Sequence, residues 1–299
     1  MNTAELIAQV RQAATLEDES TEFTDAEITR VMNQTMGSVF EPLIAQQRAG
    51  YWLHTLTRTL GTGNPYVRLH PRACALEQVD IRQGSNDWQP LTEALDSELQ
   101  DWPQRNYPVP QVYVVRGSTV TLQPAPGYSD IQLRAKVIVR PNQLVTQQTS
   151  GRVVAVDTTA RTISVSGTVL DQTTGTPVSG VLVVDVIEPR GNFERSLFDA
   201  PAQALDSSTF QIGAGPNLSR VEIGDYVRVA GQTDWPQLPE SFHHVLATAT
   251  AGTICVRRDM ADRAGTLGDI ASSNLQRLID HLSPRTRSTT HKPLQHSWR

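Results

Sequence analysis

Carboxylate side chains in the second half of the chain are the first residues that could carry out acid–base chemistry. Catalysis by an acid and a base needs two groups placed around one substrate, and the spacing of these carboxylates indicates no such pair. This holds for Asp157, Asp185, Glu188, Asp199 and Asp225. Asp225 directly follows Gly224 ahead of a strand-like segment, so a role in a turn is the better interpretation of that residue.

Histidine, glycine and serine motifs give no further indication of a reaction. His243 and His244 are adjacent, so on a helix their rings point about 100° apart and cannot share a metal ion. We expect them to occupy surface or capping positions. The segments Gly61–Gly63 and Gly213–Gly215 lack the Lys-Ser/Thr of a phosphate-binding loop and are interpreted as turns. No serine lies in a Gly-x-Ser-x-Gly elbow. We therefore expect no enzymatic activity, no cofactor and no metal.

The two cysteines, Cys74 and Cys255, are too few for a metal cluster or a disulfide framework. Two buried thiols in a reducing compartment are the first interpretation. The alternative is one bridge between the two halves of the chain, which requires Cα atoms within roughly 7 Å of each other.

Composition limits the classes of function. The 299 residues are 38% apolar and 19% charged, which is typical of a globular protein of about two domains. The net charge of −5 argues against a surface that wraps DNA, whereas a ring that lets DNA pass without gripping it is compatible. The beginning of the chain lacks a signal-peptide pattern, and no stretch approaches ~20 apolar residues. We expect an intracellular protein that does not enter a membrane.

Helical periodicity marks both ends of the chain. A first helix is predicted over residues 3–16, and a second begins at a capping box formed by Thr24 and Glu27. We expect the second helix to kink at Pro42 and to resume as far as Leu60. Two more helical stripes follow residue 238. Their apolar members are Phe242, Val245, Leu246, Ala249 and Val256, and then Leu267, Ile270, Ala271, Leu275, Leu278 and Leu282.

Short strand-like segments fill the middle of the chain. Those between residues 66 and 137 predict a small antiparallel sheet, with a hairpin turn at residues 116–118. Those between residues 149 and 234 are regularly spaced and predict a small barrel or sandwich. The fold class is therefore α+β. Its predicted units are a helix-and-sheet domain, an inserted all-β domain and an extended tail, with bounds 1–148 plus 235–282, 149–234 and 283–299.

The tail is the one segment with an unusual composition. It carries four Lys or Arg residues, no acidic residue and two prolines. It is either a solubilising end or a peptide that becomes ordered on a partner, where tryptophan is a common contact residue. The residues expected to bind are Arg285, Arg287, Lys292, Leu294, Trp298 and Arg299.

Five segments in a fixed order add a resemblance to these patterns. They are residues 23–33, 66–71, 112–126, 138–144 and 238–246. They resemble, in turn, the opening helix, the first strand, the strand–turn–strand unit with its prolines, the strand ending in Arg-Pro and the C-terminal helix start of head-to-tail adaptor (connector) proteins of tailed bacteriophages. The first strand departs from the family pattern, because His70 separates Leu69 from Pro71. The resemblance covers most of residues 20–145 and 238–282.

The resemblance implies a structural virion protein of the phage neck, made in the host cytoplasm. Such adaptors form a ring, typically dodecameric, beneath the portal protein. The ring extends the DNA channel and gives tail or stopper proteins a platform. A ring needs two different faces on each subunit. The C-terminal tail would then be the segment that embraces the portal.

Other functions remain open from the residues alone. A stopper, a tail terminator or a tail-tube subunit would fit the β-rich middle of the chain. A hydrolase using carboxylates of that region is a further alternative. A carbohydrate-binding module would use aromatic side chains as a stacking platform, although packing against neighbouring prolines explains them equally well. The candidates for that platform are Trp88, Trp102 and Trp235.

Overall fold

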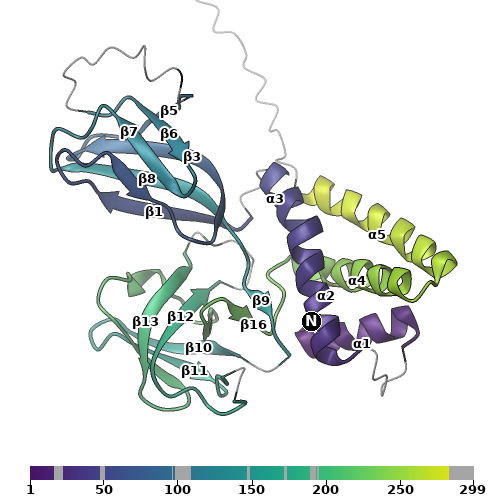
Figure 1. Cartoon of the computed structure of the whole chain (residues 1–299). Coiled ribbons are helices and arrows are strands. Elements are labelled where there is room, and N and C mark those ends of the chain that lie inside the picture. Colours follow the sequence, from purple (N-terminus) through teal and green to yellow (C-terminus); the bar gives the residue numbers. More distant parts are fainter. Residues whose placement is uncertain are drawn as a thin grey trace, which may run out of the picture.

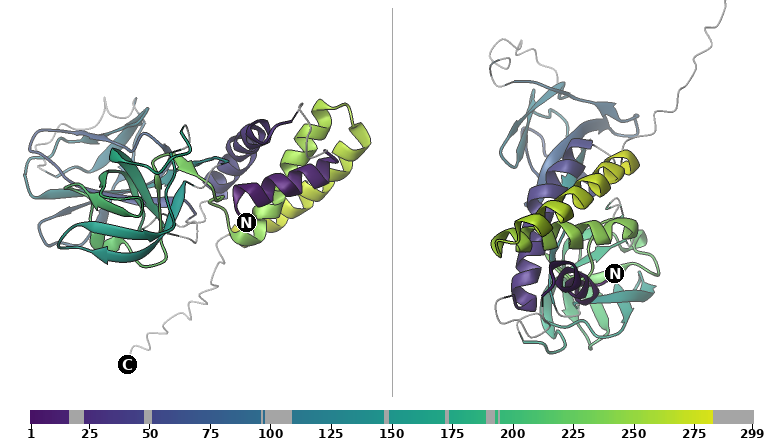
Figure 2. Two further views of the ribbon diagram at one scale, coloured as in Figure 1. Left: turned by 90° about the horizontal axis from the view of Figure 1, so that it is seen from below. Right: turned by 90° about the vertical axis from the view of Figure 1, so that its right-hand side faces the viewer.

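The computed structural model shows an α+β chain whose helices gather on one side and whose strands form two β units on the other (Figure 1). The view from below shows the same division (Figure 2, left). The structure describes residues 1–16, 23–47, 51–95, 97, 109–146, 149–171, 174–188, 193 and 195–282.

The helices come from the two ends of the sequence. They are α1 (Thr3–Ala14), α2 (Asp25–Thr35), α3 (Glu41–Gln47), α4 (His243–Arg257) and α5 (Ala261–Leu282). Helix α4 contacts α1, α2 and α5, and thus joins the N-terminal helices to the C-terminal one. Two helical apolar residues differ from expectation, since Val256 and Ile270 are exposed.

Polar caps begin the first two helices. Asn2 and Glu5 form a complete capping box at α1, which the sequence pattern did not reveal. At α2 the predicted box is only half formed. Thr24 accepts a hydrogen bond of 3.3 Å from the N–H of Glu27, but the Glu27 carboxylate binds Arg30 and Arg257 instead of turning back to the cap.

The predicted kink at Pro42 is a π-helical turn. This turn, η1 (Met36–Phe40), joins α2 to α3, and the N–H of Glu41 donates to the carbonyl of Met36, five residues back. Proline has no N–H, and its ring clashes with the carbonyl four residues earlier in a regular α-helix. The wider turn ahead of Pro42 lets the chain continue in the helical direction.

The prediction that this helix continues to Leu60 was wrong, because Leu53–Thr59 is strand β1. Leu53, Leu56 and Leu60 happen to follow helical spacing. The β-branched residues Thr55, Thr57 and Thr59 alternate through the same segment, and such residues favour strands. The strand outcome follows from that alternation and from pairing with β8.

The first β unit contains two four-stranded sheets rather than one small sheet. One has the order β1-β8-β3-β4 and is antiparallel, and the other has the order β2-β7-β6-β5, with β5 parallel to β6. The predicted hairpin turn joins β6 to β7 and contains Gly117 at φ +59°. The strands are β1 (Leu53–Thr59), β2 (Tyr66–Arg68), β3 (Ala73–Gln83), β4 (Gln89–Pro90), β5 (Thr92–Glu93), β6 (Val112–Arg116), β7 (Thr119–Gln123) and β8 (Ile131–Val139).

The second β unit is a closed six-stranded barrel with the order β10-β11-β14-β13-β12-β15. Strand β13 had no sequence prediction, because its alanines and Pro201 are poor strand residues. Pro201 is exposed there, and its carbonyl still accepts from the N–H of Gly213 at 2.7 Å. The strands are β10 (Ser150–Asp157), β11 (Thr162–Ser166), β12 (Gly180–Ile187), β13 (Leu197–Ala204), β14 (Thr209–Ile212) and β15 (Tyr226–Val229).

A parallel pair of two-residue strands lies where the chain enters and leaves the barrel. Strand β9 (Gln143–Leu144) precedes the barrel and β16 (Gln232–Thr233) follows it. The barrel therefore begins and ends at neighbouring points of the fold.

Two large buried clusters stabilise the described part of the chain, and a third, small one consists of Ala94, Val112 and Val114. The larger runs without interruption from the helices into both sheets, and Trp52 lies within it with no exposed surface. The indole N–H of Trp52 donates to the carbonyl of Gln237 at 2.7 Å, which ties the start of β1 to the segment after the barrel. The second large cluster fills the barrel itself and includes Val153, Phe210 and Val227.

Candidate functional site

Asp185 is the centre of a polar network where the sheets meet the barrel. It lies in β12, has no exposed surface, and accepts five hydrogen bonds. Two come from the guanidinium of Arg72 (2.8 and 2.9 Å) and one from the amide of Asn142 (2.8 Å). The backbone N–H groups of Asp199 (2.9 Å) and Gly231 (3.0 Å) supply the other two. A carboxylate offers about four lone-pair positions, so this acceptor is saturated.

Arg72 connects the two β units. It precedes β3, whereas its carboxylate partners Asp185 and Asp199 belong to the barrel. Asp199 accepts a hydrogen bond of 2.9 Å from the guanidinium of Arg72. The side-chain oxygen of Asn142 accepts another from the same guanidinium at 2.7 Å. Burial acts to lower the pKa of Arg72, but the hydrogen bonds and charges of the two aspartates raise it above its ordinary value. We call Arg72, Asn142, Asp185 and Asp199 the Arg72 network.

A β-bulge brings the backbone of Asp199 to the network. The register between β12 and β13 shifts between Val184 and Val186. Asp199 adopts φ +50°, a left-handed conformation that costs a residue with a side chain about 1–2 kcal/mol. The hydrogen bond from its N–H to Asp185 offsets this cost. Backbone strain of this kind persists where surrounding contacts determine it.

Aromatic rings pack against the network on one side. Arg72 lies 5.0 Å from the centroid of the Phe198 ring, and the rings of His54 and His70 lie 5.1 and 5.7 Å from it. Nε2 of His70 is 2.9 Å from a carboxylate oxygen of Asp199. Burial lowers the pKa of His54 to about 4 and also lowers that of His70. Both rings are therefore neutral at pH 7. The contact between the sheets and the barrel, which we call the joint, thus depends on the positive charge of Arg72.

The chemistry of this joint is structural. Both carboxylates are bound to Arg72, so neither is available to take a proton from a substrate. In the part of the chain that the structure describes, no group of three or more His, Cys, Asp or Glu side chains could hold a metal ion. A saturated ion-pair network between two β units fixes their relative orientation.

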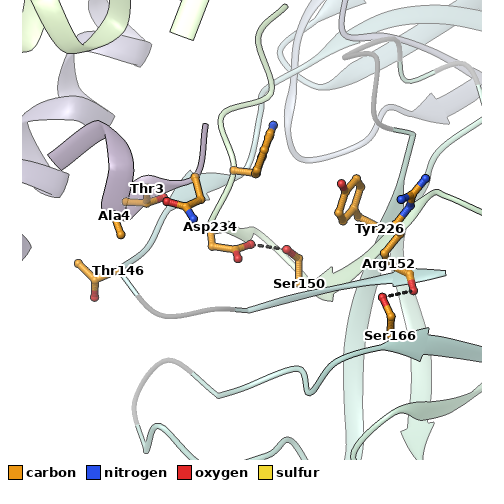
Figure 3. A pocket seen from close by; sticks show the side chains of 10 residues that line it. Thr3, Ala4, Thr146, Ser150, Arg152, Ser166, Tyr226 and Asp234 are labelled. Carbon is orange, nitrogen blue, oxygen red and sulfur yellow. Dashed lines mark hydrogen bonds between the residues drawn. The ribbon is translucent and has the colours of Figure 1, made fainter. Parts of the chain in front are cut away.

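A second polar region lies between α1 and the barrel, in a cavity of about 360 Å³ (Figure 3). The hydroxyl of Ser150 donates to Asp234 across this cavity, and the carbonyl of Asp234 accepts from the N–H of Thr3 at 2.8 Å. Nucleophilic catalysis by a serine needs an adjacent base. Within the described residues no histidine hydrogen-bonds to Ser150 or Asp234, so these contacts attach α1 to the barrel.

Three acidic side chains surround Arg195 at the edge of a third polar region. Its guanidinium lies 3.4 Å from Glu188, 2.8 Å from Glu222 and 3.5 Å from Asp225. Burial raises the pKa values of Glu188 and Asp225. Asp225 also accepts from the backbone N–H of Glu222 at 2.8 Å, which agrees with the turn role inferred for it.

Other residues singled out from the sequence occupy structural positions. Cys74 and Cys255 are free thiols, the first half-buried and the second buried. His243 is fully buried rather than at the surface, and its ring contacts the carbonyl of Leu238 at 3.0 Å. His244 is exposed, as expected.

Two of the three tryptophans proposed as a stacking platform are packed against other side chains. The guanidinium carbons of Arg82 and Arg134 lie 4.7 and 4.6 Å from the centroid of the Trp88 ring. Trp235 packs edge-on against His243. Trp102 lies outside the described residues. The same is true of every predicted tail-contact residue, namely Arg285, Arg287, Lys292, Leu294, Trp298 and Arg299.

The contacts of the Arg72 network were not predicted from the sequence, because they join residues that are distant from one another in the chain. Arg72 and Asp185 are 113 positions apart, and a single arginine before a strand carries no signal of its partner. The one relevant signal is an aspartate inside a run of apolar strand residues, Val184-Asp185-Val186. A buried charge of that kind requires an opposite charge.

Comparison with known families decides the class of protein. Residues 1–164 match the SU10 adaptor protein family, a stretch that covers more than half of the chain. The chain belongs to this family. SU10 adaptors are structural proteins of phages, and the match agrees with the adaptor resemblance of the sequence segments. The match ends inside β11, so it includes the helices before the sheets, both sheets and the first barrel strand. No curated protein matches this SU10 adaptor. None of its described helices is long and apolar enough to cross a membrane.

Proposed function

We propose that this protein is a ring-forming component of the phage neck that lies between the portal and the tail. Each subunit would bind a portal subunit, extend the DNA channel and present a platform for tail or stopper proteins. The observation that carries this proposal is the SU10 adaptor match over residues 1–164. The saturated polar networks support it as well, because they have the features of rigid joints and lack those of a reaction centre.

We also infer that the barrel is an insertion in an adaptor body. The body would comprise residues 1–148 and 235–282, and the barrel residues 149–234. The parallel pair of β9 and β16 supports this division, because Gln143 and Gln232 are register partners on either side of the barrel. The separate buried cluster within the barrel supports it too. An inserted domain of this kind gives each subunit a projection that can meet a tail or capsid protein.

DNA would pass through the ring without sequence-specific binding. The chain carries 31 acidic and 26 basic residues apart from histidine, giving a net charge of −5. Strong binding to a phosphate backbone needs clustered positive charge. A weakly acidic ring suits a channel through which DNA moves.

Native mass spectrometry of the purified protein, alone and mixed with the portal ring of the same phage, tests the proposal. We expect a monomer or small oligomer alone and one adaptor per portal subunit in the mixture. A protein that stays unassociated with the portal would contradict the neck role and favour a tail component. A parallel mixture with an unrelated portal ring controls for non-specific association.

A further inference from the structure

Arg228 is a buried arginine that forms no ion pair with the residues that the structure describes. It lies in β15, is 2% exposed, and is the direct cross-strand neighbour of Asp185. Cross-strand neighbours of opposite charge usually pair. The carboxylate of Asp185 is already saturated by other donors, and Arg228 does not form an ion pair with it in the described structure.

The guanidinium of Arg228 has few hydrogen bonds for a buried charge. Nη1 donates to the hydroxyl of Thr233 at 2.5 Å, and Nε has no partner in the described structure. The ring of Tyr226 lies 5.3 Å from the guanidinium carbon. Burial lowers the pKa of Arg228 to about 10, and the charges of Asp234 and Asp185 offset this only in part, so the group still carries its charge at neutral pH. A buried charge left in this state is costly unless an acceptor reaches it.

A cavity of about 280 Å³ adjoins this arginine and is also lined by Gln237. Gln237 is 5% exposed, and its side-chain Nε2 has no hydrogen-bond partner in the described structure. Its Oε1 accepts from the N–H of Asn142 at 2.6 Å, which fixes the amide so that the nitrogen remains the free end. Two buried side chains that line the cavity, Arg228 and Gln237, therefore each have an N–H group without a hydrogen-bond acceptor in the described structure.

We propose that this cavity binds a carboxylate group, with Arg228 and Gln237 as its hydrogen-bond donors. The planar fork of a guanidinium matches a carboxylate, and such charge-assisted bonds are stronger than neutral ones. Glu188 and Glu240 also line the cavity, and they disfavour a doubly charged phosphate more than a singly charged carboxylate. The ligand is either a free small acid or an acidic side chain of another protein chain.

Thermal unfolding of the full chain in acetate tests the proposal, with chloride at equal ionic strength as the reference. Binding to the folded state raises the Tm in a saturable way. We expect Arg228→Met to weaken acetate binding by about tenfold or more, since the variant removes the charged hydrogen-bond donor of the site. The matched control is Arg152→Met, an exposed arginine of the neighbouring strand β10 that does not line this cavity.

A second variant keeps the test decisive if Arg228→Met fails to fold. Gln237→Glu retains the oxygen that accepts from Asn142 and replaces the free donor with a negative charge. We expect it to fold and to lose acetate binding. No saturable effect of acetate on the wild-type protein, or an equal effect on wild type and a folded variant, would overturn the proposal.

Binding of two further compounds, phosphate and N-acetyl-glutamate amide, tests the chemical class of the ligand and whether it comes from a protein chain. Tighter binding of phosphate than of acetate would overturn the carboxylate assignment. N-acetyl-glutamate amide imitates an acidic side chain, so its binding alongside acetate supports a protein ligand. Binding of acetate alone supports a free small acid.

Discussion

At the scale of single residues, the charge of Arg72 determines how the sheets and the barrel hold together. Asp185 has no exposed surface, and Arg72 is the cation bound directly to it. A buried carboxylate without a cation is far less stable than a paired one. The stability of the joint therefore depends more on this pair than on the exposed ion pairs of the helices.

We expect Arg72→Met to lower the free energy of unfolding by about 3–5 kcal/mol, because it leaves Asp185 buried without its cation. Urea denaturation monitored by circular dichroism measures the change. The control is Arg30→Met, which removes a more exposed pair with Glu27 on α2 and should leave the free energy of unfolding almost unchanged. Similar losses for both variants would show that the network contributes no more than a surface pair.

Buried histidines predict how stability responds to acid. Burial lowers the pKa of folded His54 from 6.5 to about 4. Between these values the unfolded chain binds a proton that the folded chain does not, so stability falls as the pH falls, by up to about 1.4 kcal/mol per pH unit. The stability that His54 contributes is fully present above pH ~6.5, and protonation of this residue causes no further loss of stability below pH ~4.

We expect His54→Asn to reduce the loss of stability between pH 7 and pH 5, because the titrating ring is gone. His70 and His243, whose pKa values burial also lowers, keep part of the dependence. Denaturant unfolding at several pH values measures the slope. His244→Asn, at an exposed position, is the control and should leave the slope unchanged. Equal slopes for wild type and His54→Asn would contradict the prediction.

At the scale of elements, close packing inside the barrel depends on Gly151 in β10. A Cβ atom at this position would lie 2.5 Å from a methyl carbon of Val165 and 3.2 Å from one of Val169. Contacts this short force neighbouring side chains or strands to shift. The side chains of the barrel therefore leave room at position 151 for a glycine but not for a residue with a Cβ atom.

We expect Gly151→Ala to destabilise the protein by about 1–3 kcal/mol through overpacking. Differential scanning calorimetry of the full chain measures the change in Tm. Gly265→Ala on α5 is the matched control, because a Cβ atom there meets no atom within 4 Å. Alanine is favoured over glycine in a helix, so that variant should be neutral or slightly stabilising. An unchanged Tm for Gly151→Ala would show that β10 can move outward freely.

Local sequence patterns predicted those helices and strands whose apolar spacing and turn residues match the structure that they adopt. The helices at both ends, the hairpin at Gly117 and five of the six barrel strands follow from apolar periodicity and turn residues. Strand β1 was mistaken for helix because three leucines had helical spacing, and pairing with β8 decided the outcome. Strand β13 was missed because its alanines and Pro201 become strand residues only through neighbours that close the barrel.

The polar sites could not be predicted in the same way. Arg72, Asn142 and Asp185 meet only after the sheets and the barrel have formed, and the cross-strand position of Arg228 beside an already saturated Asp185 arises in the same way. Such relations depend on tertiary structure, and no spacing within one segment encodes them. The family resemblance succeeded because it used the order of many segments at once.

At the scale of the whole molecule, the proposed ring and portal contacts predict a specific role for the tail. Deleting residues 284–299 should abolish binding to the portal ring and leave the fold intact. The physical reason is that the tail combines four positive charges with two apolar side chains, Leu294 and Trp298, that gain from contact with a partner surface.

Co-sedimentation with the portal ring measures binding, and circular dichroism checks the fold. Replacing only Leu294 and Trp298 by serine separates the apolar contribution from the charges, and it should weaken binding without changing the unfolding transition. Portal binding at full strength after the deletion would refute the role of the tail.

The pairing of β9 with β16 has a consequence for how such a chain can change over generations. Because the strands on either side of the barrel lie next to each other, a single recombination event between their codons could remove the barrel or replace it with another module. The rest of the chain would keep most of the larger buried cluster, to which the barrel segment contributes Ile187 and Phe193. A phage could in this way alter what its neck presents to other proteins while the remainder of the subunit is inherited unchanged.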